Sequence, residues 1–128
     1  MKKMILIVDD DPELLEETSE LLTGHGFDTK TFSDSRKVMK AAREIVPDAI
    51  LLDLNMPYKD GFMLAAELTR SPRTRKIPII GMTGFYRGRM YANLMNVCGF
   101  HACLHKPIDP KKLISVIERE TGVKSGNG

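Results

Sequence analysis

Five side chains that can do chemistry stand where short apolar runs of this sequence end. They are three carboxylates, one hydroxyl and one amine: Asp9, Asp10, Asp53, Thr83 and Lys106. The central case is Asp53, which closes the apolar run 49–52 and is soon followed by Pro57. An unpaired carboxylate close to a core costs free energy, so Asp53 needs partners from elsewhere in the chain. We interpret the five side chains as one candidate active site.

The chemistry that these residue types favour is phosphoryl transfer. Three carboxylates facing one crevice repel one another unless a cation lies between them. Oxygen ligands without a His or Cys cluster favour Mg²⁺, which keeps several waters and shares phosphate oxygens. An aspartate such as Asp53 can then act as the nucleophile and form an acyl phosphate. Lys106 would supply a positive charge, and Thr83 a hydroxyl, to the transferring group.

Alternating apolar runs and helical periodicities predict the elements that position these residues. The expected strands are residues 4–8, 27–32, 49–53, 77–82 and 101–105. The runs 27–32 and 101–105 are the more polar ones and suit the edges of a sheet. Helices are expected after each strand, and Asp11-Pro12 has the acidic cap and early proline of a helix start. We therefore interpret Asp11 as a helix cap rather than a metal ligand.

Strand and helix alternate five times, which predicts an α/β fold with a parallel sheet covered by helices on both faces. For a doubly wound sheet of five strands we expect the flavodoxin-like order 2-1-3-4-5. Ligands then bind where the winding switches, between the first and third strands, and the three acids fall there. We expect one domain over residues 1–121 and a flexible tail or linker end over residues 122–128, which are polar and glycine-rich.

Composition excludes several classes of protein. The chain has 128 residues, of which 42% are hydrophobic and 28% charged, as in a globular domain rather than a disordered one. The apolar run after the N-terminus is too short for an export signal or a membrane span, so we expect a cytoplasmic protein. A net charge of +2 is too small to indicate nucleic-acid binding.

Five motifs in this order resemble the receiver domain of two-component response regulators. They are Val8-Asp9-Asp10-Asp11, Asp53-Leu54-Asn55-Met56-Pro57, Asp60-Gly61, Met82-Thr83-Gly84 and Lys106-Pro107. The resemblance covers roughly residues 4–121. It implies that the chain is a signalling domain rather than an enzyme. Its partners would be a sensor histidine kinase or phosphotransfer protein and an output domain or target protein.

The resemblance also implies a role for each site residue. Asp53 would accept the phosphoryl group from a phosphohistidine, with Mg²⁺ as cofactor. Asp10 would bind the ion directly, Asp9 through water, and Asn55 through its main-chain carbonyl. Thr83 and Lys106 would contact the phosphoryl oxygens, and the bond between Lys106 and Pro107 is expected to be cis.

Three residues depart from the family pattern and bear on switching. Cys103 stands where the family usually has Tyr or Phe, whose rotation reports phosphorylation. Either the coupling is therefore weaker here, or another aromatic residue takes part: Tyr86, Tyr91 or Phe100. Gly84 replaces the usual alanine after Thr83. Phe85 occupies a position that tunes loss of phosphate in the family, and an aromatic ring there could shield the acyl phosphate from water.

Other functions stay open beside this one. A degenerate receiver would act only as a docking module, independently of phosphorylation. A phosphatase with an aspartyl nucleophile would need an acid at position 55, where this chain has Asn55. A zinc site has candidate ligands, but their spacing fits no standard finger: Cys98, His101, Cys103 and His105.

The output surface is expected on the fourth helix, fifth strand and fifth helix, within residues 89–121. The sequence contains no DNA-binding or catalytic output segment, so a stand-alone receiver and a piece of a longer chain both remain open. A homodimer is left open as well.

Overall fold

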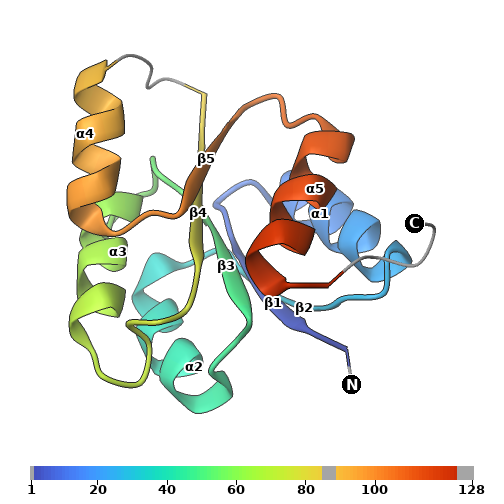
Figure 1. Ribbon diagram of the computed structural model, residues 1–128, viewed down its shortest axis with the longest axis horizontal. Coiled ribbons are helices and arrows are strands. Elements are labelled where there is room, and N and C mark those ends of the chain that lie inside the picture. Colours follow the sequence, from blue (N-terminus) through green and yellow to red (C-terminus); the bar gives the residue numbers. More distant parts are fainter. Residues whose placement is uncertain (1, 85–88, 124–128) are drawn as a thin grey trace.

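One parallel sheet of five strands forms the centre of the computed structural model, which describes residues 2–84 and 89–123 (Figure 1). Its strands are β1 (Met4–Val8), β2 (Asp28–Phe32), β3 (Ala49–Asp53), β4 (Ile79–Thr83) and β5 (Ala102–His105). The spatial order is β2-β1-β3-β4-β5, and every pairing is parallel. The predicted doubly wound fold is therefore confirmed.

Helices cover both faces of this sheet. They are α1 (Pro12–Gly24), α2 (Val38–Ile45), α3 (Gly61–Arg70), α4 (Arg89–Cys98) and α5 (Pro110–Thr121), and a short 3₁₀ helix, η1 (Ser35–Lys37), precedes α2. In Figure 1, α1 and α5 lie on one side of the sheet, and α2, α3 and α4 lie on the other. The predicted cap is confirmed, because the Asp11 carboxylate accepts hydrogen bonds from the N–H groups of Glu13 and Leu14.

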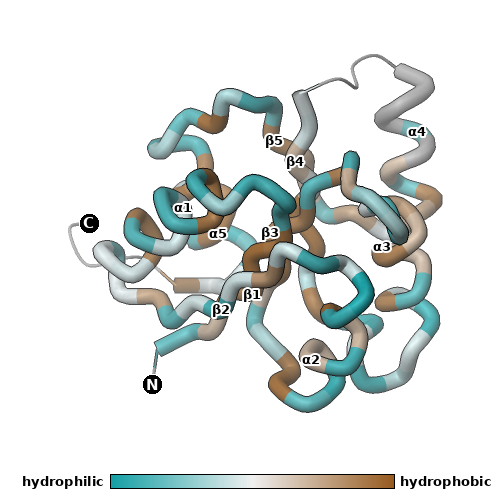
Figure 2. Tube along the Cα trace, turned by 180° about the vertical axis from the view of Figure 1, so that it is seen from behind, coloured by the Kyte–Doolittle hydropathy of each residue, from teal (hydrophilic) through white to brown (hydrophobic). Residues whose placement is uncertain are grey.

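The hydrophobic core consists of two clusters, one on each face of the sheet. Ile50 and Leu52 of β3 pack with residues of α2, α3 and α4, whereas Leu51 packs with residues of α1 and α5. Figure 2 shows this as brown, hydrophobic colour on the central strands around β3, with teal on the outward turns of α1. Since β3 is buried along its whole length, Asp53 at its end is held by a rigid element.

Four predicted strand boundaries were wrong by one or two residues: the start of β2, which is Asp28 rather than residue 27, the start of β5, which is Ala102 rather than residue 101, and both ends of β4. β4 begins at Ile79 rather than at residue 77, because Pro78 has no N–H to donate and joins the sheet through its carbonyl, which accepts from the Ile50 N–H at 2.9 Å. β4 also continues to Thr83, one residue beyond its predicted end.

No helix among the described residues combines the length and the apolar character that crossing a membrane would require.

The turn into α3 brings main chain unusually close to main chain. A Cβ atom placed on Gly61 would lie 2.7 Å from the Asp53 carbonyl oxygen and 2.7 Å from the Leu54 Cα. Both are backbone atoms of the segment that carries the candidate nucleophile, so neither can move independently of it. Glycine is therefore required at position 61 by close packing.

We expect Gly61→Ala to lower the free energy of unfolding by about 2 kcal/mol, as overpacking at an unyielding site does. Urea denaturation followed by circular dichroism measures the change. Gly24→Ala serves as the matched control, because a Cβ there has nothing within 4 Å. We expect this control to leave stability unchanged or to raise it slightly. Equal stability of the Gly61→Ala variant and the wild type would contradict the close packing.

Candidate functional site

The candidate site lies at one edge of the sheet, where the carboxyl ends of the parallel strands meet. Asp9 and Asp10 follow β1, Asp53 ends β3, Thr83 ends β4, and Lys106 follows β5. One carboxylate oxygen from each of Asp9, Asp10 and Asp53 can be chosen so that all lie within 4.8 Å of one another. The structure thus brings the three predicted acids together in space.

Asp9 is fully buried and both of its carboxylate oxygens are engaged. Oδ1 accepts from the main-chain N–H of Asp11 at 2.9 Å, which fixes the turn after β1. Oδ2 accepts from the Lys106 Nζ at 2.8 Å. Asp10, in contrast, is exposed and lies at the mouth of the cluster. The two neighbouring acids therefore differ in role: Asp9 organises the pocket, and Asp10 faces outward.

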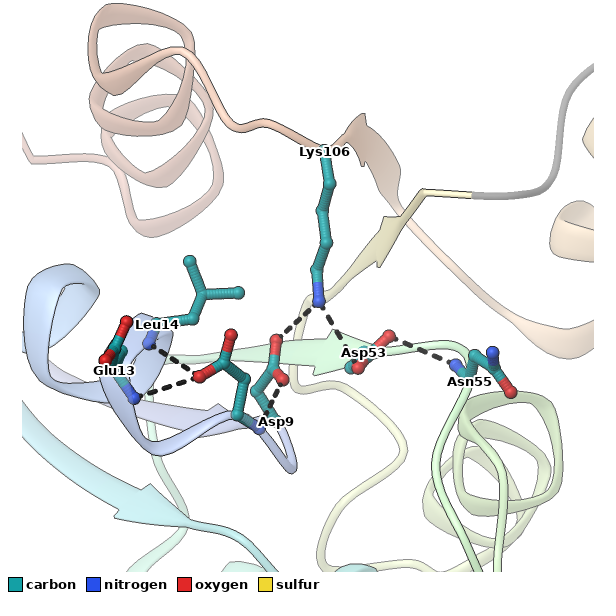
Figure 3. A network of polar contacts seen from close by, with 7 residues as sticks. Asp9, Glu13, Leu14, Asp53, Asn55 and Lys106 are labelled. Carbon is teal, nitrogen blue, oxygen red and sulfur yellow. Dashed lines mark hydrogen bonds and ion pairs between the residues drawn. The ribbon is translucent and has the colours of Figure 1, made fainter.

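Asp53 is buried, with 4% of its surface exposed. Its Oδ1 accepts from the Asn55 N–H at 3.1 Å, and its Oδ2 lies 3.3 Å from the Lys106 Nζ. Figure 3 shows the Lys106 side chain reaching from beyond β5 to the carboxylates of Asp9 and Asp53. One ammonium group thus bridges two buried carboxylates that come from different strands.

The electrostatics follow from this crowding. Burial raises the pKa of the Asp53 carboxyl above its ordinary value, and the Asp9 charge adds to the rise, although the Asn55 N–H and Lys106 oppose it. Burial opposes the charge of Lys106, but the hydrogen bond and charge of Asp9, with the charge of Asp53, raise the Lys106 pKa overall. Lys106 therefore carries its charge at neutral pH, and a further positive charge near Asp53 would offset the cost of burying its ionised carboxylate.

Thr83 and the Lys106 main chain are joined across the site. Thr83 is buried, and its carbonyl accepts from the Lys106 N–H at 2.7 Å. The peptide bond between Lys106 and Pro107 is cis, the geometry that the resemblance implies. A Cβ added at Gly84 would lie 3.9 Å from the Lys106 Cβ, an ordinary contact. The alanine that is usual in the family would therefore fit this site without strain.

The residues expected to bear on switching are described only in part. Cys103 is half-buried and packs against the core cluster of α2, α3 and α4. Phe85 and Tyr86 lie outside the described residues, as do residues 124–128 of the expected tail.

The zinc hypothesis gains no support from the described residues. Only the three acids form a group of possible ligands there. The His101 ring instead forms a hydrogen bond with the backbone of β4, since its Nδ1 accepts from the Ile79 N–H at 3.2 Å.

The donor set of the acidic cluster fits Mg²⁺. Its ligands are carboxylate oxygens, and one of the three acids is exposed. A hard cation bound there could keep water ligands on its solvent side or share phosphate oxygens. The raised pKa of Asp53 has the same implication, because a nearby cation would stabilise its ionised form.

Sequence reasoning missed three residues beside the site. Ser35 donates from Oγ to the Pro57 carbonyl at 3.2 Å, and the Arg36 guanidinium lies 3.8 Å above the centre of the Tyr58 ring. Both contacts join the turn after β2 to the loop after Asp53. No motif marks them, because the contacting residues are far apart in sequence and Tyr58 has a positive φ of 70° that periodicity does not predict.

Comparison with known proteins gives one family. A model of the response regulator receiver domain matches residues 5–118. The DNA-binding response regulator MtrA of Mycolicibacterium smegmatis is 34% identical over 115 residues, which are 90% of this chain and 49% of that protein. The DNA-binding dual master transcriptional regulator RpaA of Synechocystis is 33% identical over 112 residues, which are 87% of this chain and 46% of that protein. The chain spans about half the length of these curated relatives.

Solved structures agree with this match. The receiver domain of a sensor histidine kinase from Pseudomonas aeruginosa, which has a magnesium ion coordinated in its active site cleft, superposes with a TM-score of 0.86 at 25% identity. The superposition covers 95% of this chain and 99% of that one. The signal receiver domain of a histidine kinase from Syntrophus aciditrophicus has a TM-score of 0.85 at 29% identity and covers 98% of this chain and 96% of its own.

Proposed function

This chain belongs to the response regulator receiver domain family, and from that premise we propose that Asp53 is its phosphoacceptor in a two-component phosphorelay. The donor would be the phosphohistidine of a sensor histidine kinase or phosphotransfer protein. The observation that carries the proposal is the bridge from the Lys106 ammonium to the buried carboxylates of Asp9 and Asp53. A buried acid cluster with one matched cation is costly to build unless it serves a charged group.

The arrangement suits an in-line transfer to a carboxylate. An Oδ atom of Asp53 would attack the phosphorus, so that a P–O bond forms while the P–N bond to the imidazole breaks and its electron pair leaves with the nitrogen. Lys106 would donate to a phosphoryl oxygen, a role supported by the 3.3 Å between its Nζ and the Asp53 Oδ2. The buried Thr83 hydroxyl would donate to another.

Mg²⁺ would be held by Asp10 and Asp53, by Asp9 through water, and by the main-chain carbonyl of Asn55. When bound, the ion neutralises carboxylate charge and the charge that develops on the phosphoryl oxygens. This assignment is supported by the convergence of three acids within 4.8 Å, and a solved receiver with a magnesium ion in its cleft shares the fold.

Phosphorylation by a small acyl-phosphate donor tests the function directly. We expect acetyl phosphate with Mg²⁺ to add one phosphoryl group to the wild-type chain, seen by intact-mass spectrometry, and chelation of the ion to prevent it. A chain that binds Mg²⁺ but takes up no phosphoryl group would refute the proposal in favour of a docking module.

Asp10→Asn tests the metal assignment separately. Asn keeps the shape of the side chain but removes the charge of the exposed acid at the mouth of the cluster. We expect the Mg²⁺ affinity in calorimetric titration to fall at least about tenfold, the lower limit for lost support of a metal ligand. Asp11→Asn is the matched control, because Asn also caps helices well and Asp11 lies outside the acid cluster. Equal affinities of the two variants would contradict the assignment of Asp10.

The output would be carried by Thr83 and Cys103. Phosphate would draw the Thr83 hydroxyl inward and alter the face formed by α4, β5 and α5, to which an output domain or target protein would bind. Cys103 occupies less volume than the usual aromatic residue, so we propose that the change transmitted through β5 is smaller than in most of the family. A receiver domain over residues 1–121 is part of this proposal.

A further inference from the structure

The loop that follows Asp53, residues 54–60, is tied to the rest of the fold at several successive residues. The Pro57 carbonyl accepts from the Ser35 Oγ, the Tyr58 ring stacks under Arg36, and the Lys59 Nζ lies 2.7 Å from the Glu67 carboxylate. The Asp60 carboxylate then accepts from the Met63 N–H at 2.9 Å and caps α3. This β3–α3 loop is therefore attached to the segment before α2 on one side and to α3 on the other.

Two of these ties come from one short segment, the turn at the start of η1. Ser35 is buried with 1% of its surface exposed, so its hydroxyl is shielded from water and donates its hydrogen bond to the Pro57 carbonyl instead. Arg36 is itself fixed by Asp34, whose two carboxylate oxygens accept from Nε at 3.0 Å and from a terminal guanidinium nitrogen at 2.9 Å. The guanidinium plane is thus oriented before it meets the Tyr58 ring. We call Ser35, Arg36 and Tyr58 the latch.

Tyr58 has an unfavourable backbone conformation, so its contact with Arg36 needs a physical reason. A φ of 70° is sterically unfavourable for an aromatic residue and suits glycine, yet the residue is 73% exposed and gains little from burial. What the ring gains is the contact with the Arg36 guanidinium, a cation over an aromatic face. The geometry indicates that the strained residue attaches the outer side of the loop to the turn before α2.

The β3–α3 loop carries Asn55, whose main-chain carbonyl would be a metal ligand under the proposed function. A main-chain carbonyl has no rotamers, so the conformation of the loop alone sets its position. The Asn55 N–H is already held by the Asp53 Oδ1 at 3.1 Å, and the Gly61 N–H donates to the Leu54 carbonyl at 3.1 Å. The latch fixes the part of the loop between these two hydrogen bonds.

We propose that the latch formed by Ser35, Arg36 and Tyr58 positions the Asn55 carbonyl and thereby sets the Mg²⁺ affinity of the acidic site. This inference rests on the proposed function. Arg36 and Tyr58 are positioning residues, which act through the loop and touch neither the ion nor the phosphoryl group. Ordering the loop before the ion binds removes a conformational cost from binding, and a chain that populates the competent loop less often binds more weakly in proportion.

Tyr58→Gly separates positioning from fold stability. Glycine relieves the unfavourable φ, so we expect an unchanged or higher midpoint of thermal unfolding, while the Mg²⁺ affinity falls about tenfold because the ring contact is lost. Arg36→Met removes the cation and keeps the tyrosine, and it should lower the affinity to a similar extent. Tyr58→Phe keeps the ring over which Arg36 lies, and it should bind Mg²⁺ as the wild type does.

The measurement is calorimetric titration of Mg²⁺ together with hydrogen exchange of the loop amides of residues 55, 56, 58 and 59, since Pro57 has no N–H. Arg75→Met is the charge-matched control, since it removes an exposed arginine of the loop between α3 and β4. Weaker binding with faster loop exchange in Tyr58→Gly and Arg36→Met, and neither change in the control, is the expected result. Wild-type affinity in both variants would overturn the latch and leave the proposed function intact. A wild-type chain with no Mg²⁺ affinity would instead refute the proposed function.

Discussion

Replacement of Asp53 by asparagine is expected to abolish phosphoryl uptake completely. The substituted side chain would present a neutral amide with no carboxylate oxygen to attack phosphorus, so no acyl phosphate can form. Intact-mass spectrometry after incubation with acetyl phosphate and Mg²⁺ measures the result as the loss of the added phosphoryl mass. Of the variants considered, this one has the largest expected effect, because it removes the reacting atom itself.

The fold of Asp53→Asn should persist, which makes the loss interpretable. Lys106 keeps its shorter contact to Asp9 at 2.8 Å, and the variant removes a charge that burial disfavours. We therefore expect its thermal midpoint to equal or exceed that of the wild type in metal-free buffer. Asp60→Asn is the matched control on the same loop, since Asn also caps helices. Phosphoryl uptake that survives in Asp53→Asn would show that another residue is the acceptor.

The placement of the acids could be predicted from the sequence because it depends on topology. In a parallel sheet every carboxyl end lies on the same edge, so Asp9, Asp53 and Thr83 had to meet once their strands were assigned. The difference between the two neighbouring acids could not be predicted in this way. Asp9 is buried and Asp10 exposed because of the turn after β1, which a hydrogen bond from the Asp11 N–H stabilises.

The latch lay beyond sequence reasoning for a different physical reason. Arg36 and Tyr58 are distant in sequence, and either would pass as an ordinary surface residue. Their contact involves the positive φ at Tyr58 and the paired hydrogen bonds from the Arg36 guanidinium to the Asp34 carboxylate. Hydrophobic periodicity predicts neither of these local features. Boundaries such as the start of β4 were missed for a similar reason, because Pro78 continues the apolar pattern but cannot donate to the ladder.

Lys106→Met is expected to destabilise the metal-free chain by about 3 kcal/mol, the low end of the range for removing one partner of a buried ion pair. The ammonium is the cation that bridges Asp9 and Asp53, at 2.8 and 3.3 Å, and both carboxylates are buried. Methionine keeps the length and apolar stem of the side chain, so the loss reports the charge rather than the packing. Urea denaturation in the presence of a chelator gives the free energy of unfolding.

Mg²⁺ provides the decisive comparison for this variant. A cation bound by the acids would restore part of the missing positive charge, so we expect saturating Mg²⁺ to stabilise Lys106→Met more than it stabilises the wild type. Lys112→Met, which removes an exposed lysine of α5, should change neither the stability nor its response to the ion. If Lys106→Met unfolds at the wild-type urea concentration without metal, the ammonium does not compensate the buried acids. The pocket would then be stabilised by hydrogen bonds from its own turns, those that the N–H groups of Asp11 and Asn55 donate.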